Sequence, residues 1–189
     1  MIESADAGNG ARVASKMAQR LLVIWLVTFL SGNALLTLRA NADPAPIKIA
    51  VFDFELDDFS AAAGIAGDKA ADAAQLDRVT SEVRRLIGES RRYVLVDVSA
   101  ADGPAVKEHS LAQCDGCDAP IAQKLGAEQS LVGVVTRISR TDYVVRFEIR
   151  DAKTGEVVVA RQSDLRAGAD YSWYRGAASL IRDSLLISP

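Results

Sequence analysis

The sequence predicts an α/β fold, an α+β sandwich in which a mixed sheet has helices packed on one face. Strand-like and helix-like segments alternate through the first two thirds of the chain. After about residue 130 the apolar period changes from helical to two, which predicts three consecutive strands in an antiparallel meander. An amphipathic helix then follows. The expected order is therefore βαβαβββα.

The first half of this order rests on four segments. Residues 47–54 (IKIAVFDF) form a nearly continuous apolar run, typical of a buried strand. Residues 57–74 are rich in Ala and Gly without a clear period and predict a long loop that leads into a helix. Apolar residues recur at helical spacing over residues 76–88, and residues 93–98 (YVLVDV) resemble a second strand.

A short helix and the meander come next. Residues 120–125 predict a helix that Gly126 terminates as a C-cap. The three strands of the meander are expected at residues 131–139, 143–150 and 157–163. Every second residue of the middle strand is apolar, and these residues form its expected buried face: Tyr143, Val145, Phe147 and Ile149.

The last helix is expected over residues 172–186. Its apolar residues share one face, which we expect to pack on the meander: Trp173, Ala177, Leu180, Ile181 and Leu185. Aromatic and Arg residues also cluster at its start, and such residues are enriched at protein interfaces. We therefore expect Trp173 in the core and a possible interface at Tyr171, Tyr174 and Arg175.

The N-terminal segment has the pattern of a secretory signal peptide. Arg20 precedes the apolar run Leu21–Leu30, and Ala40-Asn41-Ala42 supplies a small-residue cleavage site. We expect residues 1–42 to be an N-terminal extension with the signal, starting at Met1 or Met17, and residues 43–189 to be one domain. An uncleaved membrane anchor over residues 21–38 is the alternative.

Charge limits the classes of partner. The formal net charge of the chain is −3, so it lacks the basic excess of a nucleic-acid-binding domain. An acidic domain also binds anionic lipid poorly, so contact with a membrane is expected only through an uncleaved signal.

A resemblance to a known family rests on five segments in order: AVFDFEL, YVLVDV, CDGCDAPIAQKLGAEQSLVGVV, DAKTGEVV and YSWYRGAASLIRDSLL. Together they resemble an uncharacterised family of secreted bacterial proteins whose fold is similar to the TolB N-terminal domain. The phrase around LGAEQSLVGVV also resembles CsgG-like envelope domains. The resemblance implies a periplasmic α/β domain that acts through protein contacts and has no established catalytic residues.

Cys114 and Cys117 are the only cysteines, and export would place them in an oxidising compartment. A structural disulfide is one interpretation of their spacing. A redox-active pair ahead of a helix is a second, although Asp115 and Asp118 disfavour a thiolate. A metal site that recruits His109 is a third, although zinc needs three or four ligands.

Four acidic residues follow the first expected strand: Asp53, Glu55, Asp57 and Asp58. The alternation of the first three would point them to one face if the strand continues that far. They predict either a solvated acidic loop or a site for a divalent cation or a cationic ligand. The EF-hand pattern is absent.

The sequence contains no nucleotide-binding or hydrolase motif, so we expect neither catalysis nor a cofactor. We expect a periplasmic binding or accessory module that contacts another protein of the cell envelope. A thiol-disulfide accessory protein, or a small-ligand or metal-binding protein, is the alternative. The sequence leaves the partner and the oligomeric state open.

Overall fold

A computed structural model describes residues 44–61, 69–101, 106, 110–168 and 172–186. The chain divides into two units, residues 1–43 and 44–189, and the account below concerns the second. The expected signal segment lies outside the described residues. Within the described residues, no helix combines the length and the apolar character that a membrane span requires.

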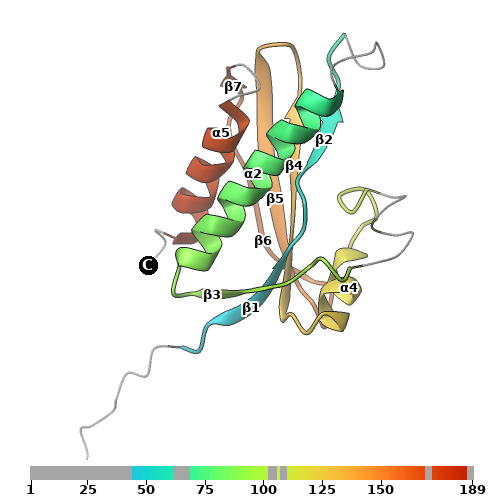
Figure 1. Ribbon diagram of the computed structural model, residues 1–189, viewed down its shortest axis with the longest axis vertical. Coiled ribbons are helices and arrows are strands. Elements are labelled where there is room, and N and C mark those ends of the chain that lie inside the picture. Colours follow the sequence, from blue (N-terminus) through green and yellow to red (C-terminus); the bar gives the residue numbers. More distant parts are fainter. Residues whose placement is uncertain (1–43, 62–68, 102–105, 107–109, 169–171, 187–189) are drawn as a thin grey trace, which may run out of the picture. The chain divides into compact units, whose positions relative to one another are not determined.

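The sheet is mixed, as predicted (Figure 1). The strand β1 (Ile47–Val51) lies between β3 (Tyr93–Val96) and β4 (Gln129–Arg137) and is parallel to both. The strands β5 (Asp142–Asp151) and β6 (Val157–Gln162) then extend the sheet in antiparallel order. The α/β class and the three-strand meander are therefore confirmed.

Two short strands were not predicted. The strand β2 (Glu55–Asp58) pairs in parallel with β4, and β7 (Arg166–Ala167) pairs with β5. Val51 pairs with Leu131, and Glu55 pairs with Val134. The step from Val51 to Glu55 is four residues long, whereas the matching step along β4 is three, so the first segment contains one extra residue. The predicted single strand 47–54 is thus interrupted after Val51, and the extra residue turns the side chains of β2 to the other face of the sheet.

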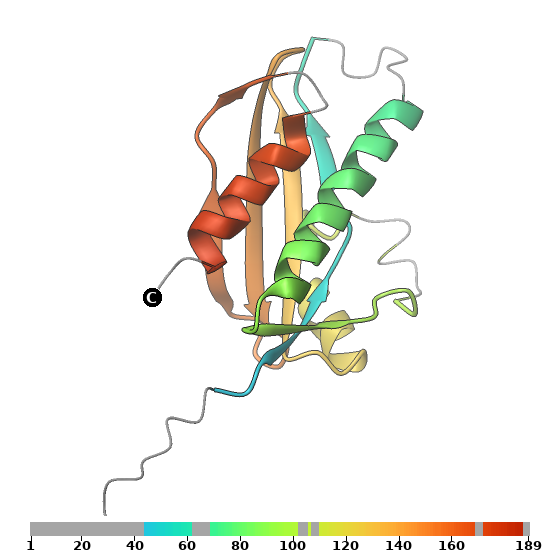
Figure 2. The same ribbon diagram turned by 60° about the vertical axis from the view of Figure 1, so that its left-hand side comes forward.

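The two long helices lie side by side on one face of the sheet (Figure 2). They are α2 (Lys69–Glu89) and α5 (Trp173–Ile181), and a π-helical turn η2 (Arg182–Leu186) continues α5. The predicted final helix is confirmed. The loop predicted over 57–74 was wrong at both ends, because β2 begins the stretch and the alanines that open α2 favour a helix without any apolar period.

The main core lies between these helices and the sheet. The predicted buried face of β5 is confirmed, and Trp173, the first residue of α5, is 1% exposed in this core. The core joins residues from seven elements, among them Ile49, Val51, Val79, Val83, Ile87, Tyr93, Leu131, Val135, Tyr143, Val145, Phe147, Ile149, Trp173, Ala177, Ile181 and Leu185.

The short helix α4 (Asp118–Lys124) lies on the opposite face, so the prediction that all helices share one face was wrong for this helix. The reason is that β1 and β4 are apolar on both faces: Ala50, Phe52 and Val132 point away from α2 and need their own cover. Seven residues cover only part of that face. The predicted terminator Gly126 follows α4 with φ 83°.

Candidate functional site

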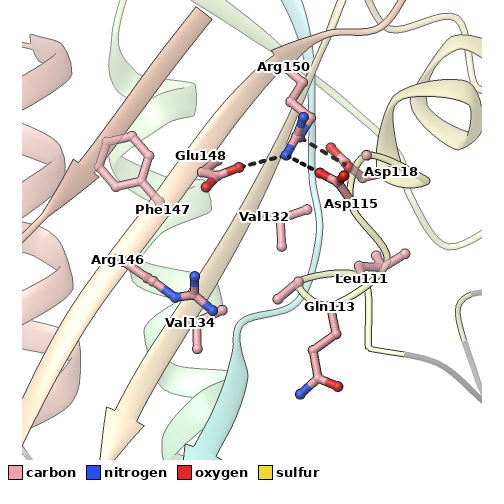
Figure 3. Close-up of a pocket in the computed structure, with 12 residues that line it drawn as sticks. Leu111, Gln113, Asp115, Asp118, Val132, Val134, Arg146, Phe147, Glu148 and Arg150 are labelled. Carbon is pink, nitrogen blue, oxygen red and sulfur yellow. Dashed lines mark hydrogen bonds and ion pairs between the residues drawn. The ribbon is translucent and has the colours of Figure 1, made fainter. Parts of the chain in front are cut away.

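A pocket of about 180 Å³ lies on the face that α4 leaves partly uncovered (Figure 3). The turn between Ser110 and Cys117 forms one wall, and β5 forms the other. Side chains from four segments line it, among them Leu111, Gln113 and Asp115 from the turn, Asp118 from α4, Val132 and Val134 from β4, and Arg146, Glu148 and Arg150 from β5. The floor is therefore apolar and the walls are charged.

Arg150 organises the polar end of the pocket. Its Nη2 lies 2.9 Å from Oε2 of Glu148 and 3.6 Å from Oδ1 of Asp115, and its Nε lies 3.8 Å from Oδ1 of Asp118. The Asp118 side chain is only 3% exposed. Its other carboxylate oxygen accepts a 2.5 Å hydrogen bond from Ser130 Oγ, so the buried charge has partners on both oxygens.

Arg146 forms the other end of the pocket and is paired with Asp57 of β2. Nη2 of Arg146 donates to Oδ2 of Asp57 at 3.3 Å, and Nε2 of Gln113 donates to Oδ1 of the same carboxylate at 3.5 Å. The Arg146 side chain is 40% exposed, whereas that of Arg150 is 17% exposed. A ligand can therefore reach the Arg146 end of the pocket more easily than the Arg150 end.

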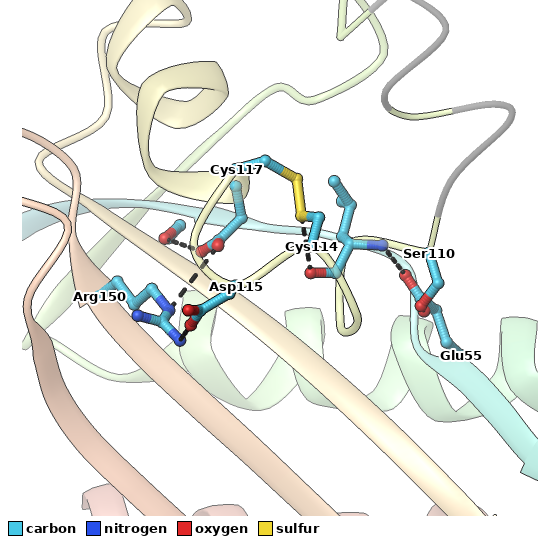
Figure 4. Close-up of a disulfide and its surroundings, with 9 residues drawn as sticks. Glu55, Ser110, Cys114, Asp115, Cys117 and Arg150 are labelled. Carbon is cyan, nitrogen blue, oxygen red and sulfur yellow. Dashed lines mark hydrogen bonds and ion pairs between the residues drawn. A yellow bond between two sulfur atoms is a disulfide. The ribbon is translucent and has the colours of Figure 1, made fainter.

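Cys114 and Cys117 form a disulfide that closes the turn against the sheet (Figure 4). Between them, Asp115 and Gly116 have φ values of 46° and 98°, in the region that favours glycine. A side chain at Gly116 would begin 3.5 Å from Nη1 of Arg150, so the turn lies directly on this guanidinium. The disulfide thus helps hold one wall of the pocket in place.

The metal interpretation of these cysteines has no support in this geometry. A metal binds the thiolate, and both sulfurs are engaged in the disulfide. His109, the third expected ligand, lies outside the described residues. Among the residues that the structure describes, no three His, Cys, Asp or Glu side chains are grouped as metal ligands.

The structure does not bring the four predicted acidic residues together. Glu55 and Asp57 face the pocket side: Glu55 accepts hydrogen bonds from Ser110 Oγ and, at 2.7 Å, from the backbone N–H of Leu111 (Figure 4). Glu55 therefore fastens the start of the turn to β2, while Asp57 reaches the pocket through Arg146.

Asp53 and Asp58 have partners elsewhere. Asp53 pairs with Arg84 of α2 at 3.0 Å, and Asp58 pairs with Arg137 at 3.1 Å, beside Asp72 of α2. Burial opposes ionisation of Asp58, but hydrogen bonds from Ser60 and Arg137 outweigh it and lower its pKa. Each carboxylate thus has its own donor, and none of these arrangements needs a shared cation.

The predicted interface residues are only partly described. Tyr171 lies outside the described residues, and Arg175 is exposed. Tyr174 is half-buried against the main core, and the guanidinium of Arg78 lies 4.7 Å from the centre of its ring. Tyr174 therefore contributes to packing between α5 and α2 as well as to the surface.

The pocket was not predicted from the sequence. The pattern of the chain by itself places Arg146, Glu148 and Arg150 only on the solvent-facing side of a strand, and Asp118 only beside a cysteine. The available signal was the run of three alternating charges in the middle of a strand. Charges at such positions need partners, and here Asp115 of the disulfide turn and Asp118 of α4 supply partners to Arg150.

A family model described as "Protein of unknown function (DUF2380)" matches residues 47–185. The predicted resemblance to an uncharacterised family is thereby confirmed. No curated protein matches the chain.

Solved structures resemble the chain at low identity. The C-terminal domain of LpoB from Salmonella enterica is 15% identical, with a TM-score of 0.45, over 67% of this chain and 87% of that one. TolB from Acinetobacter baumannii is 15% identical, with a TM-score of 0.45, over 76% of this chain but only 29% of TolB. The lipoprotein GNA1162 from Neisseria meningitidis is 14% identical, with a TM-score of 0.40, over 76% and 99%.

Proposed function

The chain belongs to the family of unknown function whose model matches residues 47–185, and we propose that it is an exported accessory module that binds another protein of the cell envelope. In this proposal the pocket beside the disulfide receives one side chain of the partner. The sheet and the disulfide turn hold the pocket walls, and the partner supplies the anchor.

The size of the pocket carries the proposal. Sites for cofactors and small-molecule substrates commonly enclose about 300–1,000 Å³, whereas this pocket holds about 180 Å³. That volume suits a single amino-acid side chain. Protein interfaces concentrate their binding energy in such anchors, seated in well-packed pockets.

The charge of the pocket favours a basic anchor. Three carboxylates line it, from Asp115, Asp118 and Glu148, against two guanidinium groups, and Asp57 adds a fourth carboxylate beside it through its ion pair with Arg146. A Lys or Arg side chain would lay its aliphatic stem on the Val132 and Val134 floor and present its charge to this acidic excess.

Export is part of the proposal. The signal-like segment that ends at Ala42 supports it, and a disulfide persists in an oxidising compartment such as the periplasm. We do not extend the proposal to thiol exchange, because Asp115 and Asp118 beside the sulfurs disfavour the thiolate that exchange requires.

Site-specific photo-crosslinking in intact cells tests the proposal. A photoreactive residue at Gln113, on the pocket rim, is expected to give one discrete adduct with an envelope protein. The same residue at Lys124, exposed on α4 but outside the pocket lining, should give none.

Charge reversal then tests the pocket itself. Glu148→Lys should lower the yield of the Gln113 adduct about tenfold, the effect of roughly 1.4 kcal/mol of lost binding. Glu156→Lys makes the same charge change in the exposed β5–β6 turn and should leave the yield unchanged. Equal yields from Gln113 and Lys124, or equal effects of the two reversals, would contradict the proposal.

A further inference from the structure

The strand β6 forms one edge of the sheet in the described part of the chain, and it is independent of the pocket. Nearly all of its residues are exposed. Val157 and Val158 are 46% and 53% exposed, and Leu165, just beyond the strand, is 62% exposed. An edge strand of this kind presents unpaired backbone groups and apolar side chains to solvent.

The alternation of hydrogen bonds along the β5–β6 ladder shows which backbone groups of β6 point away from the sheet. The Ser163 N–H donates to the Val145 carbonyl at 2.8 Å, which makes these two residues a hydrogen-bonded pair. In an antiparallel ladder such pairs alternate, so Arg161 and Val159 also bond toward β5. The N–H and C=O groups of Ala160 and Gln162 therefore point away from the sheet.

The hydrogen bonds between β4 and β5 lead to the same assignment. Ile138 N–H donates to the Asp142 carbonyl at 2.9 Å, and every second residue of β5 counted from Asp142 is then bonded to β4. Arg146 and Glu148 are among these residues. These two residues lie opposite Gln162 and Ala160. Since their backbone groups are directed to β4, they leave the β6 groups opposite them without a partner in β5.

The Arg161 side chain is hydrogen-bonded to one of these outward-facing backbone groups. Its Nη1 donates to the carbonyl oxygen of Ala160 at 2.8 Å. The arginine side chain thus covers the carbonyl at the middle of the edge in the free protein. A cation at this position also protects an edge strand from pairing indiscriminately.

We propose that β6 binds an extended segment of a partner protein by strand addition, and that this segment carries an acidic side chain opposite Arg161. The partner's backbone would bond to Ala160 and Gln162, as extended peptides do at other open sheet edges. Its carboxylate would bind the Arg161 guanidinium in place of the Ala160 carbonyl. That carbonyl would then be free to accept a hydrogen bond from the incoming strand.

Charge disfavours a second copy of this chain as the occupant. Two β6 strands related by a two-fold axis at Ala160 would place each Arg161 opposite the other copy's Val159. The two arginine residues would then share one face at the diagonal position, with their backbones roughly 7–8 Å apart and their long side chains within reach of one another. Like charges there repel, whereas an acidic partner residue is attracted.

Two short peptides serve as probes with the exported protein labelled for NMR. They are acetylated and amidated, and have the sequences Thr-Val-Glu-Val-Thr and Thr-Val-Lys-Val-Thr. The Glu peptide is expected to shift the amide resonances of Ala160 and Gln162 and to bind at least tenfold more tightly than the Lys peptide. Arg161→Glu should reverse this preference, and Lys153→Glu, in the exposed β5–β6 turn, should not.

Ala160→Pro tests the edge geometry. Proline removes an outward N–H and leaves the inward ladder bonds intact, so the protein should stay folded and lose peptide binding. Peptide binding that persists in this variant, equal affinity for the two peptides, or no shift at β6 would overturn the proposal. Concentration-dependent dimerisation abolished by Ala160→Pro would assign the edge to a second copy and would also overturn it.

Discussion

Gly133→Ala is the sharpest test of how β1, β2 and β4 fit together. Gly133 lies in the middle of β4, where the ring of Phe54 crosses the strand after the interruption between β1 and β2. A Cβ atom added at Gly133 would lie closer than 3.0 Å to three atoms of that ring, a spacing that real Cβ atoms essentially never show. The substitution therefore requires the ring or the strand to move.

The ring has little room to retreat. Phe54 is 3% exposed, and its backbone N–H donates to Oγ1 of Thr80 on α2 at 2.9 Å. Overpacking at such a site costs about 1–3 kcal/mol. That is a large share of the roughly 5–15 kcal/mol by which a domain is stable.

Urea denaturation of the exported protein measures this cost. Gly133→Ala should lower the midpoint while leaving the slope of the free energy of unfolding against urea unchanged. Phe54→Ala should itself cost about 3–5 kcal/mol because it leaves a cavity. In that background Gly133→Ala should cost close to nothing, since the clashing ring is gone.

The double-mutant cycle makes the reasoning refutable. An equal cost of Gly133→Ala with and without the Phe54 ring would show that the overlap is not the cause. No cost in either background would show that β4 does not approach Phe54 as described. The result also bears on the pocket, because Phe54 precedes Glu55, which fastens the pocket turn to β2.

Four further outcomes are expected. Trp173→Ala should lower the free energy of unfolding by about 3–5 kcal/mol in urea denaturation, because the indole is buried in the main core, and a loss below about 1 kcal/mol would contradict that placement. Replacing both Cys114 and Cys117 with Ser should cost no more than about 2 kcal/mol, since the disulfide closes a very short loop; thiol mapping of the exported protein should find no free thiol. The lowered pKa of Asp58 means that its stabilising contribution is complete above its ordinary value of 3.8 and is lost as the pH falls through the folded-state pKa. Asp58→Asn should therefore reduce the acid dependence of the urea midpoint, and an unchanged acid limb would refute the ion pair's role. N-terminal sequencing of the exported protein should begin after Ala42, whereas a retained apolar segment would indicate an anchored protein.

The meander and the last helix could be predicted from the sequence. Along β5 every second residue is apolar, and this period by itself assigns Tyr143, Val145, Phe147 and Ile149 to one face. Trp173 follows in the same way from helical spacing. Both features are local, because the spacing of apolar residues along a strand or helix depends only on residues close together in the sequence.

The expected acidic site shows where local patterns stop. Alternation alone would place Asp53, Glu55 and Asp57 on one face, but the interruption after Val51 separates Asp53 from the other two. That interruption depends on the room that Gly133 gives to Phe54, some eighty residues away. A one-residue shift in a strand turns every later side chain to the other face.

By itself the sequence determined the fold class, the meander with its buried face, and the place of Trp173 in the core. Only the tertiary structure decided that α4 covers the second face, that Arg146, Glu148 and Arg150 meet the disulfide turn in a pocket, and which backbone groups of β6 face outward. The physical reason is the distance along the chain between the residues that interact. Periodicity reports which side of an element avoids water, but pockets, ion pairs and free sheet edges arise from the register between distant segments, and that register is set by packing of the whole domain.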